Sequence, residues 1–277
     1  MTAGRAPVGA GAEPALCAIA VMAKAPRPGA AKTRLVPPLA AEEAAALSAA
    51  FLRDVTENLA IASARAPIGG YVAYAPAGSA ALFDGLLAPG TRLLLADGSP
   101  AMPPRVTGFG RSLLHAAQGL FALGHGAACL LNSDSPTLPT RLLLEAAEAL
   151  ARPGDRVVLG PAEDGGYYLI GLKAPHAHLF EDVRWSSAHV AAETVARAAA
   201  LGLELVRLAS WYDVDDRAAL GRLLGELARQ GADSEAAHVP YAAPATAACL
   251  SRLALGERLR RAAAAEDRRV SLGSMAP

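Results

Sequence analysis

The chain has 277 residues, 53% of them hydrophobic, so it can bury a large core and fits one large domain, alone or with an appendage. Its 26 Lys and Arg residues balance its 26 Asp and Glu residues, which argues against an overall field that would hold a nucleic acid or an anionic membrane surface. No apolar run approaches the ~20 residues that a membrane span requires, so we expect no integral membrane segment.

Three scattered cysteines form neither CxxC pairs nor a His/Cys cluster, so neither a zinc site nor a disulfide framework is predicted. Cys17 and Cys129 lie in apolar runs, which is typical of buried, inert thiols. These cysteines are consistent with a reducing cytoplasm, and we expect a cytoplasmic protein.

The two ends of the chain differ in composition from its middle. Residues 1–14 are rich in Gly, Ala and Pro without periodicity, which predicts a disordered leader. Residues 15–230 are predicted to form the main domain, and residues 231–277 a C-terminal loop followed by a basic helical extension from about residue 247 to 269.

Between the ends, short apolar runs alternate with longer amphipathic segments. In chain order we predict a strand at 16–23, helix at 40–65, strand at 70–75, short helix at 80–87, strand at 92–96, helix at 110–123, strand at 127–132, helix at 140–151, strands at 156–160 and 167–171, and helices at 188–201 and 217–229. Strands that follow one another through helices predict an α/β, Rossmann-type fold, with a mainly parallel sheet flanked by helices. Ligands of such sheets bind outside the carboxyl ends of the strands.

The loop after the first predicted strand carries four cations beside a Gly/Pro-shaped turn: Lys24, Arg27, Lys32 and Arg34, with Gly29 between them. Backbone amides in a tight turn and flexible cations suit a di- or triphosphate, so this loop is the predicted nucleotide site. The glycine spacing excludes a Walker A loop, and a solvated basic loop is the alternative.

Asp134 follows the most apolar predicted strand. A carboxylate there suits Mg²⁺ or Mn²⁺ that bridges substrate phosphate oxygens. The alternative is a helix N-cap, although Thr137 and Thr140 lie closer to the next predicted helix.

Two acids and a Gly-Gly pair stand between the next two predicted strands. Glu163 and Asp164 are the candidate catalytic residues, because a carboxylate at a sheet edge can act as general base toward an acceptor hydroxyl. Gly165, Gly166 and Tyr167 are assigned to the acceptor or sugar pocket, while a plain hairpin turn remains the alternative for the glycines.

A last acidic cluster precedes the helix predicted at 217–229. Asp213 and Asp215 lie two apart on an extended segment, so they would project to the same side and could complete a metal site opposite Asp134. Asp216 is predicted to cap the helix.

At these positions the chain resembles a bacterial family of uncharacterised glycosyltransferase-like proteins (domain of unknown function 2064) in the nucleotide-diphospho-sugar transferase superfamily, which implies a GT-A-like fold. The resemblance rests on four stretches: AKAPRPGAAKTRL, NSDSPTLP, GPAEDGGYYLIGL, and VRWSSAHV followed by DVDD. The first loop and its helix are also similar to the guanylyltransferases that activate phospholactate in deazaflavin cofactor synthesis.

The resemblance also implies residue roles. Lys24, Lys32 and Arg34 would contact nucleotide phosphates, Asp134 would bind the metal with Asp215 as second ligand, and Trp185 and Ser186 would border the acceptor pocket. The chain departs from the family at Gly108-Phe109-Gly110-Arg111, where an acidic residue is expected, and at Asn132, where glycine is usual. Both departures lie near the expected base or sugar pocket, so the donor of relatives is not assigned to this chain.

Three hypotheses follow. The first is a metal-dependent glycosyltransferase that moves a sugar from a nucleotide-diphosphate sugar to a small or lipid-linked acceptor. The second is a nucleotidyltransferase that condenses a nucleoside triphosphate with a phosphorylated metabolite and releases pyrophosphate. The third is an inactive nucleotide-sugar binding module, because a fold alone never proves turnover.

Overall fold

The computed structural model describes residues 16–229 and 238–258 of the chain. The predicted leader at 1–14 and the part of the predicted basic tail beyond residue 258 lie outside the described residues.

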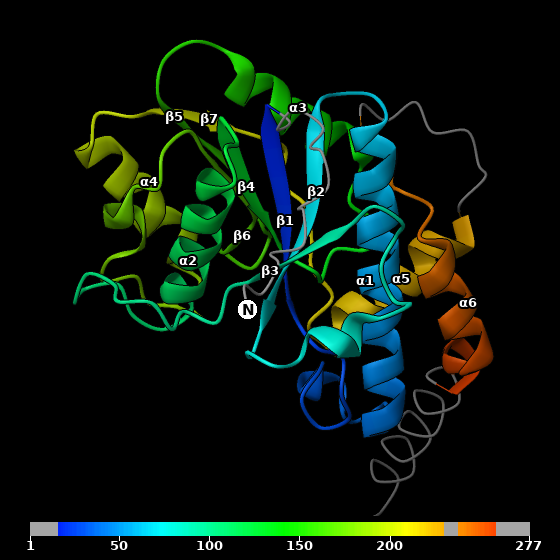
Figure 1. The fold of residues 1–277 in the computed structure, drawn as a ribbon. Coiled ribbons are helices and arrows are strands. Elements are labelled where there is room, and N and C mark those ends of the chain that lie inside the picture. The colour runs from blue at the N-terminus through cyan, green and yellow to red at the C-terminus, as the bar shows by residue number, and fades with distance from the viewer. Residues whose placement is uncertain (1–15, 230–237, 259–277) are drawn as a thin grey trace, which may run out of the picture.

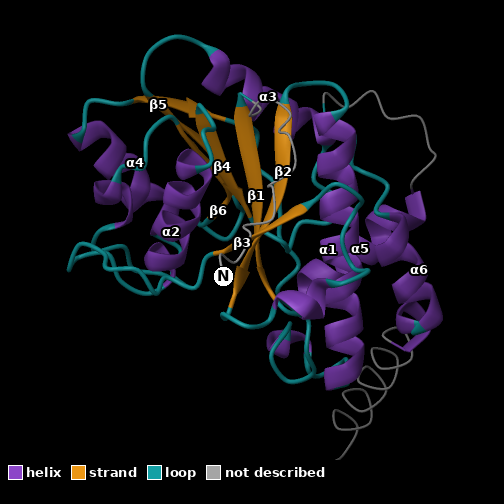
Figure 2. Cartoon of the chain, viewed as in Figure 1, coloured by secondary structure: helices purple, strands orange, loops and turns teal. Residues whose placement is uncertain are grey.

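Within the described residues, seven strands form one sheet (Figures 1 and 2). They are β1 (Cys17–Lys24), β2 (Ile68–Ala75), β3 (Arg92–Leu95), β4 (Ala127–Leu131), β5 (Arg156–Pro161), β6 (Tyr167–Leu172) and β7 (Glu204–Arg207), in the spatial order β3-β2-β1-β4-β6-β5-β7. Every pair is parallel except those that β6 makes with β4 and β5. The predicted mainly parallel sheet is confirmed.

Helices cover both faces of the sheet. Successive side chains of a strand point to opposite faces, so a buried strand packs against both helix layers. Ile19 of β1 packs with α1 (Ala41–Ser63) and α3 (Thr140–Ala151), whereas its neighbour Ala20 packs with α2 (Phe109–Ala122) and α4 (Val190–Ala200). A further layer lies on the outer side of α1, where α5 (Arg217–Arg229) and α6 (Pro244–Arg252) share a third apolar cluster with it (Figure 1).

Most predicted elements are present, with two corrections. The helix predicted at 80–87 is a single 3₁₀ turn, η2 (Ala80–Phe83), like η1 (Thr33–Leu35) and η3 (Ala177–Phe180). The helix predicted at 247–269 begins earlier, at Pro244, which suits a first helical turn because proline lacks the N–H that would be unpaired there. This helix, α6, ends at Arg252, and a left-handed residue, Ala254, interrupts it. The chain is helical again at residues 255–258, and the rest of the predicted helix lies outside the described residues.

All three cysteines are buried and free, which confirms the prediction for Cys17 and Cys129, whose sulfurs lie 3.9 Å apart. None of the described helices combines the length and apolar character needed to cross a membrane.

The strand directions bring distant loops to one edge of the sheet. The carboxyl ends of the parallel strands β1, β4, β5 and β7 meet there, and β6 begins there because it runs the opposite way. The basic loop, the Asp134 loop, the Glu163–Asp164 turn and the acidic cluster before α5 each follow one of these ends. All predicted loops therefore face a single site.

Candidate active site

The basic loop between β1 and α1 is largely exposed. Lys24, Arg27 and Arg34 have exposed side chains, and Gly29 adopts a left-handed conformation with φ of 73°. Among the described residues no ion pair holds any of these three cations. Their charges are thus available to an anionic ligand at this edge.

Lys32, from the same loop, is buried instead, with only 6% of its side chain exposed. Its Nζ lies 2.7 Å from Asp134 Oδ1 and 2.9 Å from Asp215 Oδ1, and it donates a hydrogen bond of 2.9 Å to the Val214 carbonyl oxygen. The ammonium also lies 5.4 Å from the centre of the Phe51 ring on α1. One lysine thus joins two of the three predicted metal ligands, Asp134 and Asp215.

Backbone and side-chain hydrogen bonds hold the Asp134 loop to the segment before α5. The Val214 N–H donates to the Asp134 carbonyl oxygen at 2.9 Å, and the Ser135 hydroxyl donates to the Tyr212 carbonyl oxygen at 2.9 Å. These bonds fix the loops independently of either carboxylate, so Asp134 and Asp215 are positioned by the backbone.

Asp216 accepts a 2.8 Å hydrogen bond from the Ala219 N–H, which confirms its predicted role as the cap of α5. No side-chain cap is present at the start of α3, so Asp134 does not cap that helix. The alternative that Asp134 is an N-cap is wrong, so its carboxylate is available to bind a ligand at the candidate site.

Carboxylates shift the pKa values of two groups in the site, Lys32 and Asp213. Burial alone would lower the pKa of Lys32, but the charges and hydrogen bonds of Asp134 and Asp215 outweigh it, so the pKa is raised and the amine stays protonated. Burial, with the charges of Asp164 and Asp215 next, raises the pKa of Asp213 to about 6. The Asp213 carboxyl therefore interacts with Asp164, Asp215 and Asp134, and two of these three, Asp134 and Asp215, also bind the Lys32 ammonium.

The donor set fits a divalent cation that also binds phosphate. In the described ranges, 16–229 and 238–258, no group of three or more His, Cys, Asp or Glu residues is close enough to hold a metal by itself. Mg²⁺ is usually bound by only one or two carboxylates together with substrate phosphates and waters. Asp134 and Asp215 both contact the Lys32 ammonium, so their carboxylates lie close enough together to provide the one or two protein ligands that Mg²⁺ needs.

The turn between β5 and β6 is a hairpin, as the alternative for Gly165 and Gly166 predicted. Asp164 Oδ1 accepts a 2.8 Å hydrogen bond from the Gly166 N–H, and Gly165 has a φ of 92°. A Cβ on Gly165 would overlap the carbonyl oxygen of Ala188, so only glycine allows this close approach. The hairpin also lies at the edge where the other loops meet, so the structural role does not remove it from the site.

The two candidate catalytic acids have different surroundings. Glu163 is paired at 2.6 Å with Arg222 of α5, whose guanidinium stacks 3.9 Å from the centre of the Tyr212 ring. Asp164 is exposed, and its charge raises the pKa of Asp213. Of the two acids, Asp164 is therefore the one that interacts with the Asp213 carboxyl, whereas Glu163 is held in an ion pair with Arg222.

The expected acceptor pocket lies on the α2 side of the site. Trp185 packs against Gly108 and Gly110, and its ring meets that of Phe109 edge to face, with centres 5.7 Å apart. Tyr167 is partly buried in the same apolar cluster as Trp185. Ser186 is exposed, with a left-handed φ of 61°.

Sequence reasoning missed two side chains at this site. Phe109 is 48% exposed beside Trp185, and its position inside the segment that departs from the family was the available indication. Phe51 gives no such indication, because it lies within a long apolar helix pattern and meets Lys32 only through the fold.

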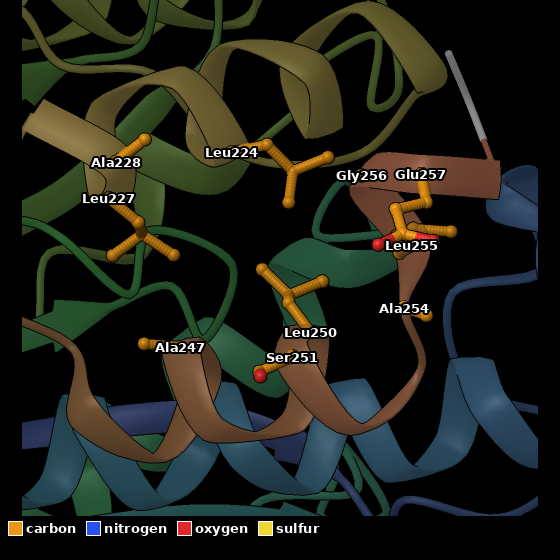
Figure 3. A pocket seen from close by; sticks show the side chains of 10 residues that line it. All are labelled: Leu224, Leu227, Ala228, Ala247, Leu250, Ser251, Ala254, Leu255, Gly256 and Glu257. Carbon is orange, nitrogen blue, oxygen red and sulfur yellow. The ribbon is translucent and has the colours of Figure 1, made fainter. Parts of the chain in front are cut away.

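A pocket of about 330 Å³ between α5 and α6 is separate from this site (Figure 3). Its walls are mainly apolar, with Leu224 and Leu227 on α5 facing Leu250 on α6. None of the predicted site residues lines it.

Residues 58–187 match the family model described as "Uncharacterized protein conserved in bacteria (DUF2064)". Asp134, Asp164, Trp185 and the hairpin fall inside this range, whereas the basic loop and Asp215 lie outside it. No curated protein matches the chain.

Solved structures match over more of the chain. A candidate nucleotide-diphospho-sugar transferase from Desulfovibrio desulfuricans G20 is 27% identical, with 86% of this chain and 95% of that chain covered and a TM-score of 0.68. CMP:2-keto-3-deoxy-manno-octonic acid synthetase in complex with CTP is 12% identical over 77% of this chain and 99% of that chain, with a TM-score of 0.48. The 4-diphosphocytidyl-2C-methyl-D-erythritol synthase of Anaerococcus prevotii DSM 20548 is 7% identical over 78% and 100%, with a TM-score of 0.47. The first match confirms the nucleotide-diphospho-sugar transferase fold, and similarity at the level of the other two does not establish an activity.

Proposed function

We propose that this chain, which belongs through residues 58–187 to the family of uncharacterised bacterial proteins DUF2064, is a metal-dependent transferase that uses a nucleotide-activated donor. The donor is a nucleotide-diphosphate sugar, and the sugar passes to a small or lipid-linked acceptor. One observation carries the proposal: a loop of four cations and a pair of carboxylates meet at the carboxyl edge of the sheet, joined by Lys32. The similarity to the Desulfovibrio protein supports the same class of donor.

The residues divide between donor and acceptor. Lys24, Arg27 and Arg34 have free, exposed charges in the described structure and would bind the diphosphate, with Lys32 nearby. Asp134 and Asp215 would hold Mg²⁺ or Mn²⁺, which stabilises the negative charge on a departing diphosphate.

Asp164 would act on the acceptor side. Its carboxylate is exposed at the edge of the site, where it can accept a proton from an acceptor hydroxyl. Trp185 and Phe109 would form the apolar wall against which the acceptor lies. Because Glu163 is already paired with Arg222, its role would be to hold the hairpin against α5.

Nucleotidyl transfer is the second candidate. Four cations in one loop also match the larger charge of a triphosphate, and the same loop could then stabilise pyrophosphate as the leaving group. The two reactions would use the same site and differ in the atom that the acceptor attacks. In glycosyl transfer this atom is a carbon of the donor sugar, and in nucleotidyl transfer it is the α-phosphorus of the triphosphate.

A thermal-shift screen separates these candidates. Purified protein is heated with nucleotide sugars or nucleoside triphosphates, each with and without Mn²⁺, because a ligand that binds only the folded protein raises the melting temperature. We expect one nucleotide sugar to stabilise the protein in the presence of Mn²⁺. Stabilisation by a triphosphate alone, with pyrophosphate release in the presence of acceptor, would favour nucleotidyl transfer, and no stabilisation by either would favour the inactive binding module.

The metal assignment has its own test. We expect Asp134→Asn to weaken metal-dependent binding of the stabilising nucleotide at least tenfold, or about 1.4 kcal/mol, because the substitution removes one of the two anionic ligands. Isothermal titration with Mn²⁺ measures this, and Asp155→Asn is the control, since Asp155 pairs with His176 at the opposite edge of the sheet. An unchanged affinity for Asp134→Asn would contradict the assignment.

A further inference from the structure

Lys32 uses its whole hydrogen-bonding capacity inside the protein. An ammonium has three N–H donors, and here Asp134, Asp215 and the Val214 carbonyl oxygen each lie within 2.9 Å of Nζ. With 6% of its side chain exposed, Lys32 has no donor left for a phosphate in this arrangement. It differs in this respect from Lys24, which ends β1 just before this loop and is exposed.

The choice of lysine is itself informative in this chain. The sequence holds 26 Lys and Arg residues, yet its only lysines are Lys24, Lys32 and Lys173. Lys24 is the last residue of β1, and Lys32 lies in the loop that follows it. Lysine is a compact charge on a flexible four-carbon stem, so it can move between partners more readily than the fork-shaped arginine side chain.

We propose that Lys32 is an exchangeable internal cation, which competes with the divalent cation for the Asp134–Asp215 pair and transfers to a phosphate of the substrate when the metal binds. This inference rests on the proposed function, because it assumes that the same site receives a metal and a phosphorylated donor. It adds a coupling that the assignment of ligands does not contain: the metal and the phosphate each assist binding of the other through Lys32.

Electrostatics supports the exchange. A divalent cation held by Asp134 and Asp215 would compete with the Lys32 ammonium for the same two carboxylates and repel it. A displaced ammonium that stayed buried without a partner would be strongly unfavourable. The proposed phosphate site lies beside it, near Lys24, Arg27 and Arg34, so a bound phosphate could become its new partner. Metal binding without phosphate is therefore opposed by Lys32, and phosphate removes that opposition.

The test compares Mn²⁺ binding by the unaltered chain and by Lys32→Met, with free Mn²⁺ measured by electron paramagnetic resonance and no phosphate present. Methionine keeps the length and apolar stem of lysine but removes the charge. We expect Lys32→Met to bind Mn²⁺ more tightly by about tenfold, within the 5- to 150-fold range typical of coupled sites. Inorganic pyrophosphate should tighten Mn²⁺ binding to the unaltered chain more than to Lys32→Met.

Lys173→Met is the matched control, because Lys173 donates to the Arg152 carbonyl oxygen at the opposite edge of the sheet, and its Mn²⁺ affinity should not change. Equal Mn²⁺ affinity for Lys32→Met and the unaltered chain would overturn the exchange and leave the proposed function intact. Failure of all three proteins to bind Mn²⁺, with or without pyrophosphate, would overturn both.

A second measurement needs no substitution, since Lys32→Met leaves two carboxylates facing each other and could unfold the protein. With three lysines in the chain, the ¹⁵N signals of the side-chain ammonium groups can be assigned individually. Addition of Mg²⁺ together with pyrophosphate should shift the Lys32 signal and leave that of Lys173 in place. Binding of both ligands with an unchanged Lys32 signal would overturn the proposal.

Discussion

Gly165 controls how closely the β5–β6 hairpin approaches the chain before α4. Its φ is 92°, its carbonyl oxygen accepts a 3.0 Å hydrogen bond from the Ala191 N–H, and a Cβ at this position would overlap the Ala188 carbonyl oxygen. Asp164 precedes it directly. The position of the candidate general base therefore depends on the absence of a side chain at the next residue.

We expect Gly165→Ala to lower the free energy of unfolding by more than about 2 kcal/mol, because backbone strain of about 1–3 kcal/mol adds to the steric overlap. Gly29→Ala is the control: Gly29 also has a positive φ, of 73°, but a Cβ added there would meet nothing within 4 Å, so only strain should appear. Urea denaturation of both variants measures the difference. Equal losses in the two variants would contradict the close approach at Gly165.

At the scale of single residues, the sequence predicted which residues are functional candidates better than it predicted which residues contact one another. Asp216 was recognised as a cap because the helix that it begins is local. The contact of Lys32 with Asp134 and Asp215 joins residues more than 100 positions apart, and no local pattern encodes it. From the sequence, Lys32 was assigned to phosphate and the two carboxylates to a metal ion. Only the fold reveals that the lysine and the carboxylates contact each other directly.

At the scale of elements, α6 is tied to α1 by one buried carboxylate. Asp54 of α1 is fully buried and accepts hydrogen bonds from the first turn of α6, at 2.9 Å from the Ala245 N–H and 2.6 Å from the Thr246 N–H. A side chain from one helix thus performs the capping function for another. No side chain of the preceding residue, Ala243, could do so.

We expect Asp54→Ala to lower the free energy of unfolding by about 1–2 kcal/mol at neutral pH, because two buried N–H groups lose their acceptor. The loss should depend on pH. Burial raises the pKa of Asp54 despite the hydrogen bonds that oppose the shift, so the folded protein holds this proton more tightly than the unfolded chain, whose pKa is about 3.9.

The sign of the pH effect follows from that shift. The contribution of the titrating group is fully present below the unfolded pKa and is lost as pH rises through the raised folded pKa, while alanine does not titrate. The difference between the unaltered chain and Asp54→Ala should therefore be larger near pH 4 than near pH 7, in chemical denaturation at both values. A difference that grew with pH would mean that capping by the ionised form outweighs its burial.

Element types followed from hydrophobic periodicity, and the helix predicted at 140–151 coincides with α3. Strand direction did not, because a two-residue period is the same in both directions. The antiparallel course of β6 has a simple cause: only five residues separate β5 from β6, and a parallel connection needs a dozen or more. That length was readable in the sequence and decides between a hairpin and a crossover.

At the scale of the whole molecule, the layer formed by α5 and α6 reaches the candidate active site through α1. Phe51 belongs to the apolar cluster that α1 shares with Leu223 of α5 and Leu250 of α6, and the same ring lies against the Lys32 ammonium. The predicted boundary near residue 230 separates α6 from this cluster, and it stays a prediction. Packing instead favours α6 as part of the core that supports the site.

A chain ending at Arg229 decides between these two views. Such a truncation removes Cys249, Leu250 and Leu255, each at most 3% exposed, from the cluster on the outer side of α1. Full burial of one side chain of this kind contributes about 1.5–3 kcal/mol, so we expect a loss of several kcal/mol and a melting temperature lower by roughly 2–4 °C for each kcal/mol. The uncovered face of α1 should also bind an apolar dye. An unchanged melting temperature without dye binding would mean that the segment after residue 230 is an appendage, as composition alone suggests, and that Phe51 and Lys32 are held by the sheet domain without it.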